Sequence, residues 1–409
     1  MEPKLSARYS PRLIHASTEL QAGRMLAEIG VDPYGIRAML PKMRSLLIAL
    51  DNVECRVANI LKQEMLASGG DAAVHRDSVA CAKPSTDVLI MGTPKQIRLL
   101  ASKLAAQPFG LSGLSRRLIE ILENSEWTDY RLRTGRREMT LGITTAVMGI
   151  LNVTPDSFSD GGQFPTVDAA VQCGCRMVDT GADFIDVGGE SSRPGAEPVA
   201  PDVELARVLP VIETLRSRVD VPISIDTTKA EVARRALAAG AEIVNDISAM
   251  TSDPAMPAVV SESGAAVILM HMRGLPKTMQ ETLPEYRSLP GDVVLYLTER
   301  LEAAQKKGIG FDRIIVDPGF GFGKSIEDNL SLLNGLAELR VLGRPILAGV
   351  SRKSFVRQIT GDALTVSAEG TTAAITVAAM NGAAIVRVHD VPAARKVVAM
   401  IDALRRARA

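Results

Sequence analysis

The sequence contains few aromatic residues, no excess of charge of either sign and no long apolar segment. Aromatic residues make up 3% of the 409 residues, so the interior must be built from Ala, Val, Ile, Leu and Met. Such side chains suit a parallel sheet that helices cover on both faces. Lys plus Arg and Asp plus Glu number 47 each, and this balance argues against a nucleic-acid-binding or polybasic membrane protein. The sequence has no window of ~18 consecutive apolar residues and no apolar segment like that of a signal peptide near the N-terminus, so we expect a cytoplasmic protein.

Cysteine is also scarce, with four residues in the chain. Cys173 and Cys175 are separated by one residue, whereas redox and zinc pairs have two residues between them, and no His cluster accompanies them. A disulfide framework is typical of much shorter secreted chains. We therefore expect Cys55, Cys81, Cys173 and Cys175 to be reduced and buried.

From Val147 onward one unit recurs: a short apolar run, a polar or Gly-containing turn and an amphipathic stretch. The apolar runs are VMGIL (147–151), FIDVGG (184–189), PISIDT (222–227), EIVNDIS (242–248), AAVILMH (265–271), RIIVDPG (313–319), PILAGVS (345–351) and AIVRVHD (384–390). Each is continuous rather than alternating, which is typical of a parallel strand buried on both faces. The stretches 228–240, 293–308 and 327–343 are typical of the helices between the strands. Eight strands alternating with helices predict an α/β fold of the (β/α)₈ barrel type, which takes ~250 residues.

Residues 1–128 have a different pattern and predict a separate small α/β domain. We expect helices near 33–48 and 54–67, strands at 72–77 and 87–92, and helices at 93–107 and 112–127, each of the last two opened by a Thr or Ser cap. Nothing in this part indicates a chemical reaction. The segment YRLRTGRREMTLG (130–142) alternates around a Gly turn and predicts a β-hairpin that closes the bottom of the barrel. The two domains are therefore expected to be residues 1–128 and 129–409.

Every predicted barrel strand ends in, or is followed by, a polar or charged residue. In chain order these residues are Asn152, Glu190 and Arg193, Asp226, Asn245 and Asp246, His271, Asp317, then Ser351, Arg352 and Lys353, and finally Arg387, His389 and Asp390. Structural polar residues placed at random would mark both ends of the strands. Barrel enzymes carry their active sites at the C-terminal ends of the strands, so the pattern predicts an active site at that face.

The types of these residues indicate the class of ligand. Asp226, Asn245 and Asp317 interrupt apolar strands, which is costly unless each has a partner, and together they suit the edge of a flat, nitrogen-rich heterocycle. Cationic residues form a second set that suits a phosphate or pyrophosphate. That set consists of Arg193, Arg352, Lys353, Arg387 and His389. The two sets predict a heterocycle that carries a phosphorylated arm.

Two polar loops are expected to cover this face. NVTPDSFSDGG (152–162) carries Asp156 and Asp160 and is long for a barrel connection, so we interpret it as a mobile lid rather than a plain solvated turn. GESSRPGAEP (189–198) has a similar content of Gly, Pro and Ser. Neither loop has the His or Cys cluster of a transition-metal site, so any metal should be oxygen-ligated Mg²⁺ held largely by substrate phosphates.

Two further motifs are ambiguous. PGFGFGKS (318–325) ends like a phosphate-binding P-loop, but Pro318 stands where that pattern needs its first Gly. We expect instead a turn that passes close to a ligand, with Phe320 or Phe322 offering an apolar face. His271 is explained as well by a structural role as by a catalytic one, and Met270 or Met272 beside it could pack against a flat ring.

In order along the chain, MGILNVTPDSFSDGG, DVGGESSRPGA, SIDT, VNDIS, LMHMRGLPKTMQ, VDPGFGFGK, GVSRKSF and RVHDV resemble the successive signatures of bacterial dihydropteroate synthases. The resemblance covers about residues 130–409 and says nothing about the role of the N-terminal domain. A single tetrapeptide would be weak evidence, whereas eight motifs in the order of the family are specific. The fold of the family is a (β/α)₈ barrel, in agreement with the strand count.

The resemblance implies a transferase that joins p-aminobenzoate to 6-hydroxymethyl-7,8-dihydropterin pyrophosphate, releasing pyrophosphate and forming 7,8-dihydropteroate for folate synthesis. The implied pterin site is formed by Asp226, Asn245, Met270, Asp317 and Lys353, and the implied pyrophosphate site by Asn152, Arg387 and His389, with Asn152 also binding Mg²⁺. The implied p-aminobenzoate site, where sulfonamides compete, is formed by Phe158, Ser192, Arg193, Pro194, Phe322 and Ser354. Asp160, Asp226, Lys353 and Arg387 are the implied catalytic residues. The family commonly forms dimers, which implies a homodimer.

The usual Thr of the second loop in this family is Ser192 here, which keeps the hydroxyl and loses a methyl group. Two other functions have to be weighed against the synthase. A pterin-binding methyltransferase domain has a similar barrel but needs no pyrophosphate site, so SRKS (351–354) and RVHD (387–390) argue against it. A non-catalytic relative that kept the barrel would be expected to lack Lys353, Asp226 or the first-loop residues, and all of these are present.

Overall fold

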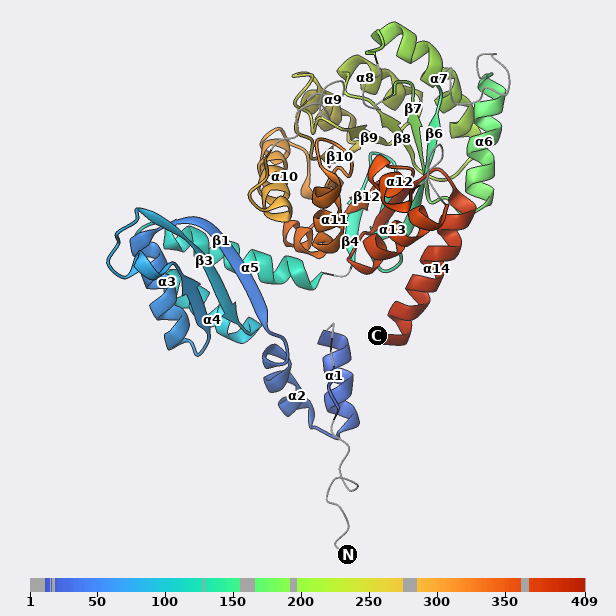
Figure 1. Cartoon of the computed structure of the whole chain (residues 1–409). Helices are drawn as coiled ribbons and strands as arrows, with labels where there is room; N and C mark the ends of the chain where they lie inside the picture. Colours follow the sequence, from blue (N-terminus) through green and yellow to red (C-terminus); the bar gives the residue numbers. More distant parts are fainter. Residues whose placement is uncertain are drawn as a thin grey trace, which may run out of the picture. The chain divides into compact units, whose positions relative to one another are not determined.

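The computed structural model describes residues 12–14, 16, 19–127, 129–154, 166–191, 197–274, 285–361 and 368–408. The chain divides into two compact units: unit 1 is Met1–Glu123 with Arg405–Ala409, and unit 2 is Asn124–Leu404 (Figure 1). Each unit has a hydrophobic core of its own. The boundary predicted near residue 128 lies between helix α5 (Leu111–Glu126) and strand β4 (Tyr130–Arg133).

Unit 1 is a small α/β fold with an antiparallel sheet. The sheet has the strand order β1-β3-β2 and consists of β1 (Leu46–Glu54), β2 (Asp71–Val74) and β3 (Ser85–Gly92). The helices are α1 (Glu19–Glu28), α2 (Pro33–Met39), α3 (Cys55–Ala67), α4 (Pro94–Leu104) and α5, with 3-10 helices at Leu40–Lys42 and Arg76–Ser78. Leu61, Ile90 and Leu118 are among the fully buried side chains of its core.

Most of the elements predicted for unit 1 are confirmed, and two predictions are wrong. Thr93 caps α4 as predicted, in a capping box with Gln96. The helix predicted at 33–48 ends as α2 at Met39, and its last residues belong to β1. This strand was missed because it lies at the edge of the sheet and buries few side chains, Ile48 among them. The prediction that a Ser caps α5 is wrong, because this helix begins at Leu111 and Ser112 lies inside it.

Unit 2 is a barrel of eight parallel strands, as predicted. The strands are β6 (Ala146–Asn152), β7 (Phe184–Gly188), β8 (Ile223–Asp226), β9 (Ile243–Asp246), β10 (Ala266–Met270), β11 (Ile314–Asp317), β12 (Leu347–Ala348) and β13 (Ile385–Val388). They pair in the order β11-β10-β9-β8-β7-β6-β13-β12, and a parallel bridge between Val316 and Ile346 joins the two ends of that order.

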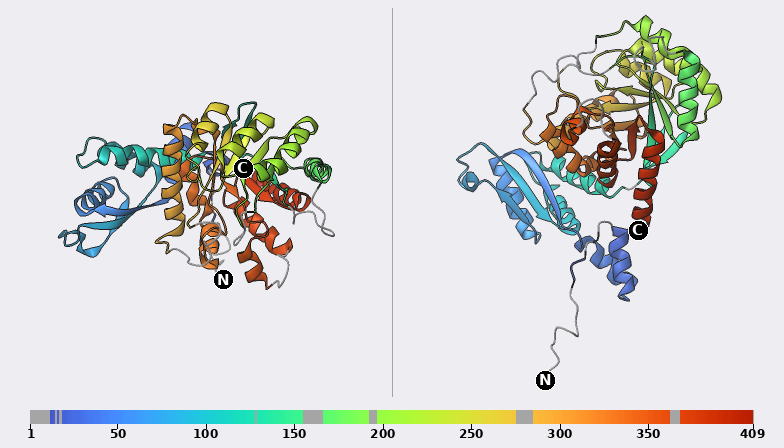
Figure 2. Two further views of the ribbon diagram at one scale, coloured as in Figure 1. Left: turned by 90° about the horizontal axis from the view of Figure 1, so that it is seen from above. Right: turned by 45° about the vertical axis from the view of Figure 1, so that its right-hand side comes forward.

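Helices surround the strands of unit 2 (Figure 2). They are α6 (Val167–Asp179), α7 (Pro201–Arg218), α8 (Ala230–Ala239), α9 (Met256–Ser263), α10 (Leu289–Lys306), α11 (Ile326–Asn334), α12 (Ser354–Thr360), α13 (Ala368–Met380) and α14 (Val391–Arg408). The stretch 327–343, predicted as one helix, is α11 followed by the 3-10 helix Leu336–Leu342. The two meet at Gly335, a residue type that disfavours the helix interior, and a Cβ there would lie 2.9 Å from the Pro290 side chain.

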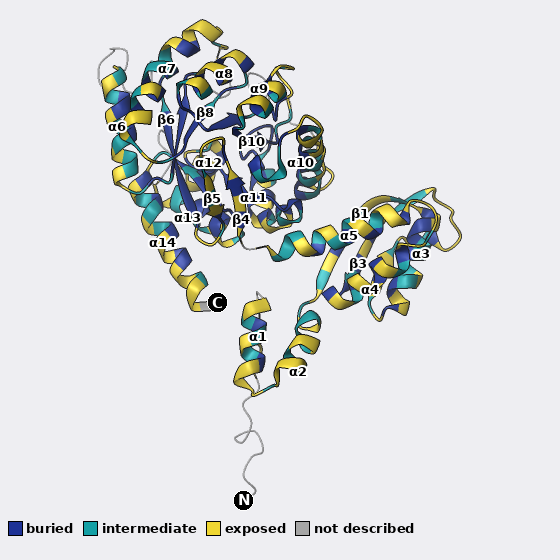
Figure 3. Cartoon of the chain, turned by 180° about the vertical axis from the view of Figure 1, so that it is seen from behind, coloured by how far each residue is buried: buried dark blue, intermediate teal, exposed yellow. Residues whose placement is uncertain are grey.

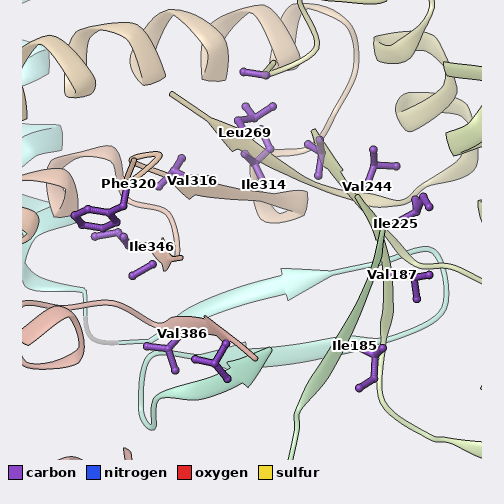
Figure 4. Packing of buried hydrophobic residues seen from close by; sticks show 14 of the residues in the cluster. Ile185, Val187, Ile225, Val244, Leu269, Ile314, Val316, Phe320, Ile346 and Val386 are labelled. Carbon is purple, nitrogen blue, oxygen red and sulfur yellow. The ribbon is translucent and has the colours of Figure 1, made fainter. Parts of the chain in front are cut away.

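Side chains alternate between the two faces of the barrel wall, so each strand contributes to two layers. Outward-facing side chains such as Ile185, Val187 and Ile225 pack in the large core of unit 2 (Figure 4). Inward-facing side chains such as Phe184 and Ile243 form a separate cluster. The strands of unit 2 are correspondingly coloured as buried in Figure 3. Because both faces are apolar along most of each strand, a polar residue in the wall needs a polar partner.

The segment 130–142 forms the predicted hairpin, from β4 and β5 (Glu138–Leu141). Leu132 and Leu141 of the hairpin join the inward-facing cluster. Thr134 Oγ1 and Arg137 Nε both donate to the carboxylate of the buried Glu242, which immediately precedes β9. The hairpin therefore closes the N-terminal end of the barrel.

The structure tests the expectations for the cysteines and for membrane-spanning segments. The four cysteines are free, but the prediction that all are buried is wrong: Cys55 is buried, Cys173 and Cys175 are half-buried and Cys81 is exposed. Within the described part of the chain, no helix is long and apolar enough to cross a membrane.

The glycines of PGFGFGKS (318–325) let the chain after β11 pass tightly over the chain after β10. Gly319 and Gly323 have φ angles of +70° and +61°, which residues with a Cβ rarely adopt. A Cβ on Gly319 would lie 2.0 Å from the carbonyl oxygen of His271, and one on Gly323 would lie 2.3 Å from that of Arg273. Contact between the two loops therefore accounts for the glycines that resemble a P-loop.

Gly319→Ala should destabilise the protein more than Gly361→Ala. The two glycines share a φ near +70°, but no atom of the described residues lies within 4 Å of a Cβ placed on Gly361. We expect the free energy of unfolding to fall by about 2–4 kcal/mol for Gly319→Ala and by about 1 kcal/mol for Gly361→Ala. Chemical denaturation of both variants measures the difference. Equal losses would show that the contact with His271 does not constrain the turn.

Chains that begin at residue 124 or at residue 129 should both fold, because the barrel has its own core. The shorter chain loses the hydrogen bond from Asn124 Nδ2 to the Val341 carbonyl (2.9 Å) and the bond from Arg340 Nη2 to the Trp127 carbonyl (3.0 Å). We therefore expect its Tm to be lower by a few degrees. Thermal unfolding of the two truncated proteins tests this, and insoluble protein in both cases would refute the independence of the barrel.

Candidate active site

The carboxyl ends of the barrel strands hold a group of inward-facing polar side chains. Each alternates with outward-facing core residues: Asp186, for example, lies between Ile185 and Val187. The strand register places Asp226 of β8 opposite Gly188 of β7 and Asn245 of β9. The polar group consists of Asn152, Asp186, Asp226, Asn245, Asp317 and Arg387, from β6, β7, β8, β9, β11 and β13. All but Asp186 were predicted from the sequence.

Arg387 links two of the carboxylates. Its Nε donates to Asp186 Oδ2 and its Nη2 donates to Asp226 Oδ2, both at 2.7 Å. Asn245 Nδ2 donates to the same Asp186 oxygen at 3.0 Å. The Asp186 side chain is fully buried, and those of Asp226 and Arg387 are 16% and 18% exposed. Four strands are therefore joined through one charged network.

Burial and ion pairing act in opposite directions within this network. Burial raises the pKa of the Asp226 carboxyl, Arg387 lowers it and Asp186 raises it again. Burial lowers the pKa of Arg387, but Asp186 and Asp226 together raise it above its ordinary value, so the guanidinium stays protonated. Arg387, which sequence analysis assigns to a separate cationic set, is thus in direct contact with the ring-binding set. The two predicted sets are not separate in space.

Lys353 and Asp317 extend the site toward the turn that follows β11. Lys353 Nζ lies over the Phe322 ring, 4.1 Å from its centroid. Asp317 Oδ1 accepts a hydrogen bond from the Gly319 N–H at 2.7 Å. Burial and the charge of Arg387 lower the pKa of Lys353 to about 8, although Asp317 and Asp226 act to raise it. A cation of reduced basicity therefore lies near the carboxylates.

Apolar side chains stand beside these polar groups. Met270 and Phe322 are buried together, with Ile247 and Met272 packed against them. This cluster could contact the face of a flat ring whose edge the polar groups bind. Of the two phenylalanines that sequence analysis left open, Phe322 belongs here, whereas Phe320 lies in the large outer core and stacks on Phe355.

Several acceptor atoms of the site have no donor among the described residues. They are Asn245 Oδ1 and the second carboxylate oxygens of Asp226 and Asp317, since only Asp226 Oδ2 and Asp317 Oδ1 accept bonds. A ligand that satisfies these acceptors must offer several N–H or O–H donors. The geometry therefore suits a nitrogen heterocycle with donors along one edge, as the sequence predicted.

Other predicted residues lie around this group. The ring nitrogen Nδ1 of His389 lies 3.1 Å from Ser351 Oγ, and the backbone N–H of His389 donates to the same hydroxyl. Asn152 is half-buried at the end of β6, and a Cβ on Gly188 would lie 3.5 Å from its Oδ1 and 3.6 Å from the Cβ of Asp226. Asn152 and Asp226 therefore flank Gly188. Arg352 and Ser354 are exposed.

His271 has a structural role in this structure. Its Nδ1 lies 3.0 Å from Nζ of the buried Lys324, which also donates to the carbonyls of Gly319 and Phe322. Burial, with a smaller contribution from Lys324, lowers the pKa of His271 to about 2, so the neutral imidazole accepts the lysine's hydrogen bond. Lys324 stands where a P-loop has its phosphate-binding lysine, yet here it holds the turn together.

Two strand-end carboxylates serve the framework instead of facing the ligand. Asp246 accepts hydrogen bonds from Ser248 Oγ at 2.6 Å and from the Met250 N–H at 3.1 Å. Glu190 pairs with Lys229, which also pairs with the fully buried Glu204. A polar residue at a strand end is therefore not sufficient evidence of a ligand contact.

Phe158, Asp160, Ser192, Arg193 and Pro194 lie outside the described residues. Asp186 and the role of Lys324 were not predicted from the sequence. Asp186 carried the same signal as Asp226, a carboxylate at an inward position of an apolar run, and could have been found by following the alternation along β7. The role of Lys324 depends on the contact between two loops, for which the sequence holds no local signal.

The barrel is similar to proteins of known function. The family "Pterin binding enzyme" matches residues 148–389. The dihydropteroate synthase of Synechocystis sp. is 48% identical over 283 residues, which cover 69% of this chain and 98% of that protein. A solved structure of the dihydropteroate synthase of Xanthomonas albilineans with 4-aminobenzoic acid is 45% identical with a TM-score of 0.63, covering 68% of this chain and 99% of that one. Another structure of that enzyme, with 7,8-dihydropteroate, is 43% identical with a TM-score of 0.60, covering 67% and 98%.

One relative extends the similarity into unit 1. A probable bifunctional folylpolyglutamate synthase/dihydropteroate synthase of Halobacterium salinarum is 43% identical over 358 residues, which cover 86% of this chain. The Synechocystis match includes 98% of that synthase and covers 69% of this chain, whereas the Halobacterium match covers 86% of this chain. The Halobacterium match therefore includes residues outside the barrel. The present chain spans 42% of the length of the bifunctional protein. The family match, the identity to these relatives and the shared barrel together show that the chain belongs to the dihydropteroate synthases.

Proposed function

We propose that the network around Arg387 binds the pterin ring and the pyrophosphate in the dihydropteroate synthase reaction, which joins p-aminobenzoate to 6-hydroxymethyl-7,8-dihydropterin pyrophosphate. One observation carries this assignment: acceptors on Asp226 and Asn245 belong to the hydrogen-bonded network of Arg387, and the charges of Asp317 and Lys353 act on that network. A dihydropterin offers amino and ring N–H donors to such acceptors. Its phosphorylated arm requires cations close by.

The pterin ring takes its hydrogen bonds from the buried residues and its stacking contacts from the apolar cluster. Asn245 Oδ1 and the free oxygens of Asp226 and Asp317 accept from the N–H groups of the ring. The Lys353 ammonium complements the ring carbonyl oxygen. Met270 and Phe322 contact the ring face. A heterocycle without these donors would leave buried acceptors unpaired, which costs about 1–3 kcal/mol for each group.

The pyrophosphate is held by Arg387, His389 and Asn152. Arg387 is protonated and is a strong partner for phosphate oxygens. Among the described residues no group of three His, Cys, Asp or Glu side chains could hold a metal ion by itself. Asn152 supplies one oxygen, so the residues present fit Mg²⁺, which binds few protein oxygens and depends on substrate phosphates. When bound, Mg²⁺ neutralises part of the charge of the leaving pyrophosphate.

The described residues stabilise charge, and none of them acts as a nucleophile. Departure of pyrophosphate leaves positive charge on the methylene group of the pterin, which the carboxylates of Asp226 and Asp317 offset in a buried site. The neutral amine of p-aminobenzoate then attacks this carbon and loses a proton. Phe322 and Ser354 belong to the p-aminobenzoate site, together with residues that the family resemblance implies and that lie outside the described part: Phe158, Ser192, Arg193 and Pro194. Asp160, which the resemblance implies as a catalytic residue, also lies outside the described part.

Unit 1 contributes no residue to the described part of this site. A homodimer and a cytoplasmic location, both expected from the sequence, stay predictions.

The purified protein, given dihydropterin pyrophosphate, Mg²⁺ and p-aminobenzoate, should release pyrophosphate and form 7,8-dihydropteroate. Asp226→Ala should lower turnover at least about 100-fold, because it removes a pterin acceptor and one of the two partners of Arg387. The matched control is Asp390→Ala, since Asp390 is an exposed carboxylate that caps the start of α14. Near-normal turnover of Asp226→Ala would refute the assigned pterin site. Tight pterin binding without any product in the unchanged protein would indicate a non-catalytic relative.

The affinity for dihydropterin pyrophosphate should fall as the pH rises through about 8. The fold lowers the pKa of Lys353, so its positive charge is present below about pH 8 and is lost above it. We expect a loss of roughly tenfold, the effect of one buried charge-assisted hydrogen bond. Calorimetric titrations between about pH 6.5 and about pH 9.5 measure it. Lys353→Arg should lack this step because a guanidinium stays protonated throughout, and an unchanged step in that variant would assign it to another group.

A further inference from the structure

Asp186 is the most deeply buried member of the Arg387 network. Its side chain is fully buried, and its Oδ2 accepts from two donors, Arg387 Nε at 2.7 Å and Asn245 Nδ2 at 3.0 Å. Its other oxygen, Oδ1, is buried and has no hydrogen-bond partner among the described residues. Asp186 therefore contacts neither solvent nor any ligand that reaches the exposed parts of Asp226 and Arg387. Asp186 therefore acts on the reaction through its hydrogen bonds to Asn245 and Arg387 and through its charge, which also raises the pKa of Asp226.

The contact with Asn245 fixes the orientation of an amide. An Asn side chain can present either its oxygen or its NH₂ group to a ligand, and the hydrogen-bond partners decide which. Because the Asp186 carboxylate can only accept, it binds the NH₂ group and leaves Asn245 Oδ1 as an acceptor. A pterin N–H donor requires this orientation.

The contact of Asp186 with Arg387, in contrast, weakens the binding of pyrophosphate. Asp186 and Asp226 together offset the single positive charge of Arg387. An incoming pyrophosphate must therefore compete with Asp186 for the same guanidinium. Removal of the Asp186 charge would leave Arg387 with one carboxylate partner and a stronger attraction for the anion.

We propose that Asp186 is a positioning residue that orients Asn245 toward the pterin and lowers the affinity of Arg387 for pyrophosphate. The inference rests on the proposed division of the site between the two ligands. One buried carboxylate thus favours binding of the ring and release of the pyrophosphate product, and it couples the two parts of the site through a single oxygen atom.

Asp186→Asn tests the proposal because it keeps the shape of the side chain and removes its charge. The two ligands are measured separately, with 6-hydroxymethyl-7,8-dihydropterin and with inorganic pyrophosphate in the presence of Mg²⁺. We expect the dissociation constant of the pterin to rise at least about tenfold and that of pyrophosphate to fall about threefold or more. Damage to the barrel would weaken both ligands, so the opposite signs separate positioning from stability.

Ser224→Ala is the matched control. Ser224 is the register neighbour of Asp186 on β8 and is equally buried, and its hydroxyl has no hydrogen-bond partner in the part of the chain that the structure describes. This variant should change neither dissociation constant by more than about twofold, since it removes no contact. Equal losses for both ligands in Asp186→Asn, or no change in either, would overturn the proposal. If the unchanged protein binds neither ligand, the proposed function is refuted, and this result is independent of any role of Asp186.

A double-mutant cycle identifies the route of each effect. With Asn245→Ala in the background, Asp186→Asn should weaken pterin binding by no more than about twofold, because the amide that it orients is gone. The gain in pyrophosphate affinity should persist, because it acts through Arg387. Additive losses of pterin affinity would show that Asp186 does not act through Asn245.

Asp186→Glu provides a second variant in case Asp186→Asn does not fold. It keeps the charge beside Arg387 but moves the carboxylate by one methylene group, so it cannot hold both donors in the same place. Pterin affinity should fall at least about fivefold with pyrophosphate affinity within about twofold of the unchanged protein. An equal loss of both affinities in this variant would overturn the proposal.

Discussion

A half-buried guanidinium between one buried and one half-buried carboxylate holds the functional end of this barrel together. Arg387, Asp186 and Asp226 come from three strands, and each would be costly to bury alone, because an isolated charge loses several kcal/mol of hydration. Arg387 therefore depends on both carboxylates, and each carboxylate depends on Arg387. Asn245 is tied to the same carboxylate, and the charges of Arg387, Asp226 and Asp317 all act on Lys353. The polar groups consequently form one interdependent set, in which a change at one member alters the orientation or charge of the others.

The apolar framework determines where this set can form. Parallel strands alternate their side chains between the outer core and the barrel interior, so inward polar residues on neighbouring strands face one another at the same height. The hairpin β4–β5 occupies the other end of the barrel, where Leu132 and Leu141 join the apolar interior. Beside the site, Lys324 and His271 hold the turn after β11 against the chain after β10, which brings Phe322 next to Lys353. Packing thus places the charges, and the charges pair because packing excludes water from them.

Unit 1 is a separate compact unit of the chain. It has a complete core between its three-stranded sheet and its helices, and it supplies none of the described residues of the site. Yet the similarity to the bifunctional protein of Halobacterium salinarum continues beyond the barrel, so part of unit 1 has a counterpart in at least one relative. The sequence of unit 1 carries no chemical signal, and the buried polar side chains among its described residues are those of Ser68, Ser78 and Ser115.

The strands of the barrel, the hairpin and the strand-end location of the site could be predicted from the sequence, because continuous apolar runs and their polar ends are local patterns. The predictions failed where the decisive contact lies far away in the sequence. Strand β1 could not be distinguished from a helix until its pairing with β3 was known. Asp246 and Asp226 look alike in the sequence, yet one faces outward to Ser248 and the other inward to Arg387.

The residue types by themselves determined the chemistry that is available: carboxylates and an amide for a heterocycle, and cations for a phosphorylated arm. Only the tertiary structure decided which of these groups form ion pairs with one another. Asp186 and Arg387 are 201 residues apart in the chain and 2.7 Å apart in the barrel. No local pattern records that distance, because it follows from the closure of eight strands around one interior.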